Sequence, residues 1–450
     1  MPPRRSRREG PGVREQPAWR WTAAPATAVG LGVVLAAAGL ALGRPDVALL
    51  GAPLLVTAAL GWQRPVPGEA GTDVEVDVDP PSSAGAGTGS RTVAYRVALH
   101  VPPGAGSALV RLALVGGRTR QVLVGPRTGE LRGSVELLGV SGPQEVVRAS
   151  VGLLAPDAGL VAGPVGESSA ERVLAPAYAP ATDLPLPPGL RGLSGVHDSS
   201  RPGQGGDFRD IGPFAPGDRL RRIDWRATAR RSRTAGEITD LYVRRSLATS
   251  DAVAVVVVDS RDDVGEVVAQ WGTNRVDRRG VSSLHLARQA ASAIAAGTVR
   301  RGDRVAFCDL LAGGRSTPVG AGDRHLRRVL AAVATTRATG VLAGVRRLPP
   351  VPPSALVYVL STFLDDVAGG AARTWRSRGH RVVAVDVLPA PRLGGSTAAQ
   401  RLAHQVVALE REDRLEDLRA VGVEVVTWAG TAGAAGRRSQ LRALSRRRLR

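Results

Sequence analysis

The chain has 450 residues, enough for two or three domains, and all 60 of its basic residues are arginine. Without lysine, it cannot be a P-loop nucleotide-binding protein, an ordinary protein kinase or a Schiff-base enzyme. The single cysteine, Cys308, excludes an intramolecular disulfide and favours a reducing compartment, and its position inside an apolar run indicates a buried side chain. A GC-rich coding sequence also favours arginine over lysine, so the net charge of +20 does not by itself indicate a polyanionic partner.

The basic residues are concentrated in three parts of the chain. Residues 1–22 hold six arginines and two glutamates, and residues 201–250 hold eleven arginines and six acidic residues. Residues 431–450 hold seven arginines and no acidic residue. Much of the excess positive charge therefore lies at the two ends of the chain rather than along one continuous binding face.

Two apolar runs near the N-terminus predict a transmembrane helical hairpin. Residues 22–43 carry no charge and residues 47–62 form a second apolar run, whereas crossing a bilayer takes roughly 20 residues. Gly39 and Gly43 form a small-residue pair through which the two helices would approach closely. Three tryptophans stand at the ends of these runs, where indole rings lie at membrane interfaces: Trp19, Trp21 and Trp62.

The distribution of arginine also predicts the orientation of this hairpin. The basic segment 1–21 precedes the first run, so the positive-inside rule places it in the cytoplasm. Two crossings return the remaining chain to the same side, and we expect a multi-pass protein of the cell (inner) membrane with cytoplasmic domains. A cleaved signal peptide is the competing interpretation. We favour the hairpin because the first run exceeds the usual signal-peptide core of about 7–15 residues and a second run follows.

Residues 72–180 read as a β-rich domain. Short runs of alternating apolar and polar residues at 73–78, 92–101, 108–115 and 134–140 are typical of half-buried strands. Strands at this spacing without helices predict a small antiparallel β-sandwich, which would act as a binding module or as a spacer. Residues 181–205, rich in Pro, Gly and Ser, are predicted to be a linker.

Residues 206–245 form the most distinctive segment of the chain. It gathers aromatic, arginine and aspartate residues in a chain that is only 3% aromatic. Pro216 and Gly217 predict a turn, to whose backbone the Asp218 side chain can bond. Asp218 and Asp224 could in principle be a general acid and base, but we favour a structural network in which arginines and aspartates pair.

Residues 250–430 predict a doubly wound α/β domain. Apolar runs at 252–259, 304–311, 355–361, 381–388 and 423–428 read as buried strands. Helical patterns at 283–299, 325–336, 367–377 and 411–421 fill the gaps, and such alternation favours a mostly parallel sheet. The remaining residues 431–450 form an Arg-rich tail, for which anionic lipid is the expected partner.

The segment from residue 206 resembles the signature of the bacterial family called domain of unknown function 58. The residues that match are Gly206, Phe208, Pro216, Gly217, Asp218, Arg221, Ile223, Asp224, Trp225, Ala229 and Arg230. The chain departs from the signature at Phe214, where tyrosine is usual, and at Gly212, where arginine is common. The resemblance implies a membrane hairpin, a β-rich region and a C-terminal von Willebrand A-like domain, so it would cover the whole chain. It also implies a partner, a MoxR-type AAA+ ATPase.

A von Willebrand A domain holds a divalent cation at the end of its first strand, in an Asp-x-Ser-x-Ser motif. Here Asp259 is followed by Arg261 and Asp263 at the two serine positions. Because a guanidinium in the ligand shell opposes Mg²⁺, we expect a degenerate site that holds no cofactor, with Asp259 and Asp263 as the residues that would bind Mg²⁺ otherwise.

Together these features predict a non-enzymatic, membrane-anchored adaptor that acts with the ATPase in assembling or remodelling other proteins. The signature residues would then be structural or partner-binding, and none would be catalytic. A metal-dependent enzyme that uses the Asp-rich segment is one alternative. A protein that binds anionic lipid or nucleic acid is the other, although the charge placement favours no specific nucleic acid.

Overall fold

The computed structural model describes residues 19–63, 72–78, 92–102, 104–125, 129–156, 158–190, 195, 197–231, 240–271, 280–311, 316–340, 347–429 and 433–446. Most of the predicted basic segment 1–21 lies outside these residues. The chain divides into two compact units, one of residues 1–139 with 144–172 and one of residues 140–143 with 173–450.

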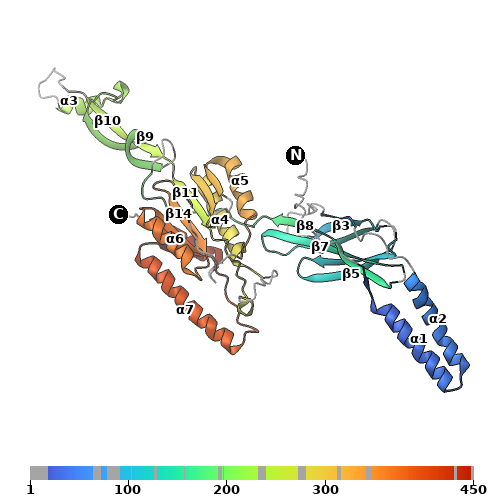
Figure 1. Ribbon diagram of the computed structural model, residues 1–450. Helices are drawn as coiled ribbons and strands as arrows, with labels where there is room; N and C mark the ends of the chain where they lie inside the picture. The colour runs from blue at the N-terminus through green and yellow to red at the C-terminus, as the bar shows by residue number, and fades with distance from the viewer. Residues whose placement is uncertain are drawn as a thin grey trace. The chain divides into compact units, whose positions relative to one another are not determined.

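Two apolar helices lie near the N-terminus, as the sequence predicted (Figure 1). Helix α1 spans Ala23–Ala41 and helix α2 spans Pro45–Gln63. The Thr22 hydroxyl begins α1 by accepting a hydrogen bond from the Ala24 N–H, which is the role of a helix N-cap. Each helix has 19 residues and is apolar enough to cross a bilayer.

The close packing of α1 against α2 uses glycines that the sequence identified only in part. A Cβ atom at Gly39 would lie 2.3 Å from the Ala48 backbone nitrogen, and one at Gly51 would lie 2.5 Å from the Gly32 carbonyl oxygen. Gly43, by contrast, has a φ of 64° and no atom within 4 Å of an added Cβ. The expected contact through Gly43 is therefore wrong, because α1 ends at Ala41 and Gly43 belongs to the turn.

The β-rich region forms two sheets, β1-β8-β7-β4-β5 and β2-β3-β6. Strand β4 pairs antiparallel with β5 and β7, and β3 pairs antiparallel with β2 and β6. Alternate residues of β3 and β4 are buried, so each sheet turns one face to the core. The strands are β1 (Arg20–Trp21), β2 (Val74–Val78), β3 (Thr92–Leu99), β4 (Ser107–Leu114), β5 (Arg118–Val124), β6 (Gly129–Glu136), β7 (Gly142–Leu154) and β8 (Leu160–Leu174).

The C-terminal part contains a six-stranded sheet in the order β13-β12-β11-β14-β15-β16. All neighbouring strands pair in parallel except β13, which is antiparallel to β12 at the edge. In sequence order the strands lie 3-2-1-4-5-6, which is a doubly wound arrangement whose order reverses between β11 and β14. The strands are β11 (Val253–Val258), β12 (Arg304–Asp309), β13 (Ser316–Gly320), β14 (Leu356–Ser361), β15 (Arg381–Asp386) and β16 (Glu424–Thr427).

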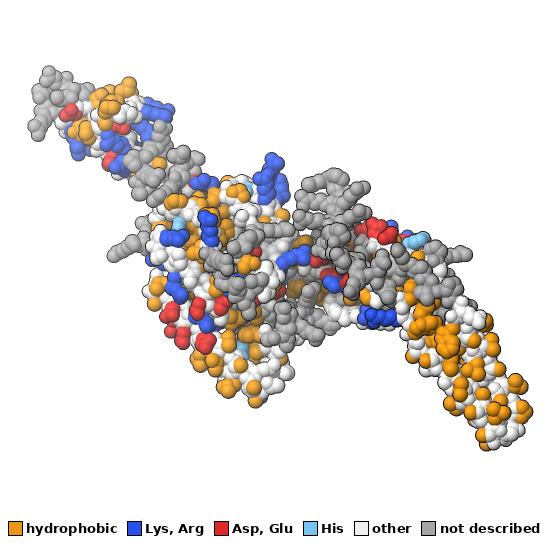
Figure 2. All heavy atoms as spheres, in the orientation of Figure 1, with side chains coloured by type: hydrophobic (Ala, Val, Ile, Leu, Met, Phe, Trp, Pro, Cys, Tyr) orange, Lys and Arg blue, Asp and Glu red, His pale blue; other side chains and the backbone are white. Residues whose placement is uncertain are grey.

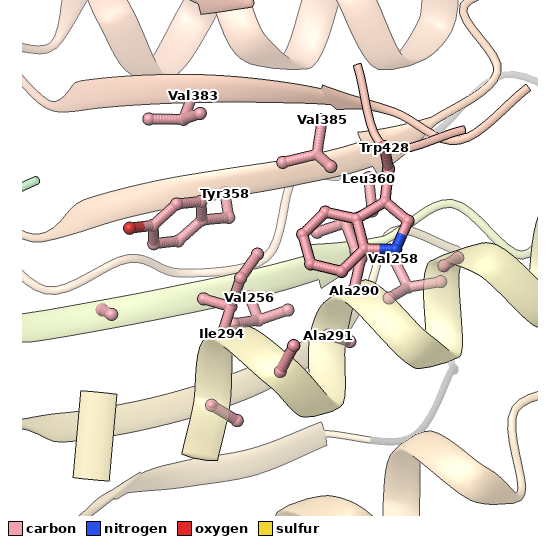
Figure 3. Close-up of a cluster of buried hydrophobic side chains, with 14 of the residues drawn as sticks. Val256, Val258, Ala290, Ala291, Ile294, Tyr358, Leu360, Val383, Val385 and Trp428 are labelled. Carbon is pink, nitrogen blue, oxygen red and sulfur yellow. The ribbon is translucent and has the colours of Figure 1, made fainter. Parts of the chain in front are cut away.

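Helices cover both faces of this sheet because its strands are apolar on both sides. Val256 and Val258 of β11 pack with Ile294 on one face (Figure 3), and Val255 and Val257 pack with Trp375 on the other. The first face is covered by α4 (Ser283–Arg300), α5 (Gly322–Ala334) and α8 (Gly433–Arg446), and the second by α6 (Asp366–Ser377) and α7 (Ala398–Ala420). A short 3₁₀ helix, η2, spans Val268–Gln270.

Two predicted peripheral segments are packed against this domain. The Ala181 N–H donates to the Ala293 carbonyl at 2.8 Å, and Leu184 is buried in the same core as Ile294. The predicted linker 181–205 is therefore anchored at its start, because Leu184 is buried in the core and Ala181 packs against it. The predicted tail 431–450 contains helix α8, whose Leu441 and Leu444 are buried in that core.

Strands β9 (His197–Pro213) and β10 (Tyr242–Ser250) form a separate two-stranded antiparallel sheet. Between them lie the 3₁₀ helix η1 (Leu220–Arg222) and helix α3 (Trp225–Arg231). We call β9, η1, α3 and β10 the signature hairpin. The predicted linker thus ends in regular structure, since β9 begins at His197.

Candidate functional site

The reversal of strand order between β11 and β14 is where doubly wound sheets place their ligand sites. Asp259 directly follows β11 and Ser361 ends β14, and both side chains are buried. The Ser361 hydroxyl donates to Asp259 Oδ2 at 2.9 Å. A carboxylate and a hydroxyl from two neighbouring parallel strands therefore meet at the switch point of the sheet.

Arg261 fills the space beside these two groups. Its Nε and Nη2 donate to the two Asp259 carboxylate oxygens at 2.9 and 2.8 Å, and its Nη1 and Nη2 donate to those of Asp365 at 2.6 and 2.8 Å. The Arg261 side chain is only 3% exposed. We call Asp259, Arg261, Ser361 and Asp365 the switch-point network.

The ion pairs of this network set its electrostatics. Burial would lower the pKa of Arg261, but the hydrogen bonds to Asp365 and Asp259 outweigh it and raise that pKa. Burial likewise would raise the pKa of Asp365, and the bond from Arg261 lowers it overall. Both groups are therefore held in their charged forms, as a bidentate arginine–carboxylate pair requires.

The neighbouring acidic residues have separate roles. Asp263, predicted as a candidate metal ligand, accepts a hydrogen bond from the Leu284 N–H at 3.0 Å. It thus supplies a partner for a backbone N–H in the first turn of α4, where such groups have none within the helix. Asp309, at the end of β12, accepts from the Ser260 hydroxyl at 2.7 Å. Burial, followed by the charge of Asp259, raises the pKa of Asp262 to about 6.

These residues do not fit a divalent cation. The oxygens of Asp259 and Asp365 face a guanidinium that already carries the compensating positive charge. Asp259 and Asp263, the pair expected to bind Mg²⁺ if any did, are committed to different partners. Within the described part of the chain, no group of three or more His, Cys, Asp or Glu side chains is placed to hold a metal ion.

The signature hairpin depends on the turn at Pro216 and Gly217. Gly217 has a φ of 99°, a conformation that side chains disfavour. Asp218 Oδ2 accepts from the Ala215 N–H at 3.0 Å and from Arg245 Nη2 of β10 at 3.0 Å. These bonds, first that from Arg245, lower the pKa of Asp218. Asp218 therefore fixes the turn and ties it to β10.

Asp224 has an equally structural role at the start of α3. Its side chain accepts from the Ala227 N–H at 2.9 Å, and its own N–H donates to the Tyr242 carbonyl at 2.8 Å. Asp218 and Asp224 are thus anchored to different pieces of backbone. The arrangement favours the structural network over the acid–base pair that the sequence also allowed.

The remaining signature residues lie mostly on the surface of the hairpin. Phe208 is 52% exposed with Arg244 stacked 5.4 Å from its ring centre, and Trp225 is 61% exposed. Arg221 and Arg230 are exposed, and neither has an ion-pair partner among the described residues. Gly206 lies in β9. Figure 2 shows hydrophobic and basic side chains together over this segment.

Sequence reasoning missed part of the polar edge of the sheet. Asp386, at the end of β15, forms an ion pair with Arg411 of α7, and the Arg411 Nε also donates to the Thr362 carbonyl at 2.7 Å. A signal was present, because Asp259, Asp309 and Asp386 each stand at the C-terminal end of an apolar strand. Parallel strands bring such residues to one edge.

Comparisons with known proteins find a match to one family model over part of the chain. Residues 210–392 match the model of a family described as Protein of unknown function DUF58. The match covers most of the signature hairpin and the whole switch-point network, whereas the β-rich region and α1 and α2 lie outside it. No curated protein and no solved structure matches the chain.

Proposed function

We propose that this chain is a non-enzymatic, membrane-anchored interaction protein with a von Willebrand A-like domain. The observation that carries the proposal is the surface of the signature hairpin. In a chain with few aromatic residues, this hairpin exposes Phe208 and Trp225 beside arginines that have no ion-pair partner among the described residues. Exposed Trp and Arg side chains are typical of the residues that dominate protein–protein binding energy.

The fold supports the von Willebrand A-like assignment. The family resemblance led us to expect a doubly wound, mostly parallel sheet, and the six-stranded sheet is parallel except at its edge strand β13 and has helices on both faces. The switch point at Asp259 is closed by Arg261, and the Ser361 hydroxyl that donates to Asp259 is buried beside this ion pair, which favours a binding role over catalysis.

Helices α1 and α2 support membrane anchoring by their length and apolar composition. The arginines of residues 1–21 favour an N-terminus on the cytoplasmic side, with the soluble domains on the same side and with membrane lipid as a further partner. The expected protein partner is a MoxR-type AAA+ ATPase, which comes from the family resemblance. Its docking surface would be complementary to the hairpin, with acidic residues around an apolar pocket.

The test is capture of that ATPase by the full-length protein. Tagged protein would be purified from its own membranes in mild detergent with a non-hydrolysable ATP analogue, and the ATPase identified by mass spectrometry. We expect it to be recovered with wild-type protein and lost with a Trp225→Ala, Arg221→Glu double variant. A matched Leu409→Ala, Arg378→Glu variant alters exposed residues elsewhere and should retain it.

The opposite results are equally informative. Absence of the ATPase from intact wild-type preparations would refute the proposed partnership. Equal capture by both double variants would show that the partner does not dock on the hairpin. Retention of DNA at physiological salt by wild-type protein, lost in the hairpin variant, would favour the nucleic-acid alternative instead.

A further inference from the structure

We propose that Arg261 is the built-in cation of the switch point, so that a covalently attached guanidinium replaces a divalent metal ion there. The proposal rests on two carboxylates that converge on one buried positive charge, with a serine hydroxyl bonded to one of them. Asp259 follows β11, Ser361 ends β14, and Asp365 precedes α6. Carboxylate and hydroxyl oxygens are the donors that Mg²⁺ and Ca²⁺ take from proteins.

The guanidinium is nearly saturated by this shell. Of its five N–H groups, four donate to carboxylate oxygens, two to Asp259 and two to Asp365. Asp259 completes its own shell with the Ser361 hydroxyl and the Arg261 backbone N–H, the latter at 3.3 Å. A metal ion could bridge Asp259 and Asp365 only by displacing the Arg261 side chain, which is 3% exposed.

The covalent attachment of Arg261 to the chain explains why its guanidinium replaces a metal ion permanently. A bound metal dissociates when its concentration falls, whereas Arg261 is held by its own backbone, two residues after Asp259. The Arg261 carbonyl also accepts from the Gly340 N–H at 3.1 Å, which fixes the loop from a third segment. The guanidinium therefore joins the end of β11 to the start of α6 at any divalent-ion concentration.

Substitution of Arg261 should accordingly turn the switch point into a metal site. Arg261→Ser removes the positive charge and leaves the Asp259 and Asp365 carboxylates without their shared partner, with the Ser361 hydroxyl bonded to Asp259, which resembles the donor set of a cation site. This outcome concerns only residues of the switch-point network and does not depend on any protein partner. Failure of the proposed ATPase partnership would leave it unaffected.

The experiment uses full-length protein in detergent, stripped with EDTA and titrated with Mn²⁺. Free Mn²⁺ is followed by electron paramagnetic resonance, and thermal unfolding is measured with and without the ion. We expect wild-type protein to bind no Mn²⁺ at this site and to unfold at the same temperature in either condition. Arg261→Ser should unfold at a lower temperature, bind about one Mn²⁺ per chain, and regain stability when the ion is added.

A matched control separates metal binding from the general loss of a buried arginine. Arg381 forms a buried ion pair with Glu424 at 2.7 Å, on strands β15 and β16. The other two groups that Arg381 contacts are the backbone carbonyls of Leu186 and Leu444 rather than another carboxylate. Arg381→Ser should therefore be destabilised, but adding Mn²⁺ should not restore it.

Several results would overturn the proposal. One is a wild-type protein that binds Mn²⁺ and loses it on Asp259→Asn. Another is a folded Arg261→Ser protein that binds none. If Arg261→Ser is unfolded after EDTA treatment, recovery of its folded state by Mn²⁺ supports the proposal, and a protein that stays unfolded with Mn²⁺ counts against it.

Discussion

The Asp365 carboxylate accepts two hydrogen bonds from the Arg261 guanidinium, at 2.6 and 2.8 Å, although 104 positions separate the two residues in the sequence. Asp365 is also the N-cap of α6, where its side chain accepts from the Val367 N–H at 3.1 Å. The Asp365 carboxylate thus caps helix α6 and also pairs with the buried Arg261, which follows strand β11. This double role links the helix layer to the centre of the sheet.

Asp365→Asn should separate these two roles. Asparagine caps helices as well as aspartate does, so α6 should begin normally, while the charge-assisted bonds to Arg261 weaken. We expect a loss of about 1 kcal/mol in unfolding free energy, since Asp365 is partly exposed. The control is Asp366→Asn, which removes a largely exposed partner of Arg414 and should change stability little. Equal effects in denaturant unfolding would contradict this account.

Asp262 should make the protein more stable in mild acid. Its pKa is raised to about 6 by burial and by Asp259, so the folded protein binds a proton more tightly than the unfolded chain does. Its contribution to stability is therefore least favourable above about pH 6 and improves as the pH falls toward the unfolded value of about 4. Asp262→Asn should remove this pH dependence of stability. It should also raise the unfolding free energy by roughly 1 kcal/mol at neutral pH.

The measurement for Asp262 is the difference in unfolding free energy between variant and wild type across this pH range. A difference that shrinks as the pH falls from about 7 to about 4 is expected. Other acidic groups titrate in both proteins and cancel in the comparison. A constant difference, or one that grows in acid, would show that Asp262 is not the group responsible.

Gly217→Ala should loosen the signature hairpin through backbone strain alone. Gly217 has a φ of 99°, and no atom lies within 4 Å of an added Cβ, so the cost is conformational rather than steric. We expect the variant to lose about 1 kcal/mol of unfolding free energy and to show faster hydrogen exchange in β9 and β10. Gly394→Ala is the matched control, because its added Cβ also meets nothing and its φ lies outside the disfavoured region. Unchanged exchange in Gly217→Ala would contradict the turn assignment.

Gly39→Ala should push α1 and α2 apart. The new Cβ would lie 2.3 Å from the Ala48 nitrogen, and backbone cannot move aside as a flexible side chain can. We expect a loss of about 1–3 kcal/mol and a longer distance between spin labels placed on the two helices. Gly30→Ala adds the same methyl group to α1, but no atom lies within 4 Å of the new Cβ. This variant should leave the unfolding free energy and the label distance unchanged. Identical label distances in the two variants would refute the close packing.

Several elements follow from local sequence, and others do not. Valine-rich runs such as 253–258 specify buried strands because they are apolar on both faces. Strand β13 was missed because its five residues, Ser316–Gly320, include proline and glycine and form a partly exposed edge of the sheet. The first half of α7 was also missed, since Leu402, Val406 and Leu409 are exposed and form no buried stripe.

The sequence by itself determined that an arginine stands two residues after Asp259, where a metal-binding motif would have serine, because that fact is a matter of spacing along one strand end. It also determined the apolar helices and the alternating strands and helices, which depend on local periodicity. Only the tertiary structure decided that Arg261 pairs with Asp365 as well as with Asp259. Asp365 reaches it because the reversal of strand order places the ends of β11 and β14 side by side, and no local pattern records a contact over that separation.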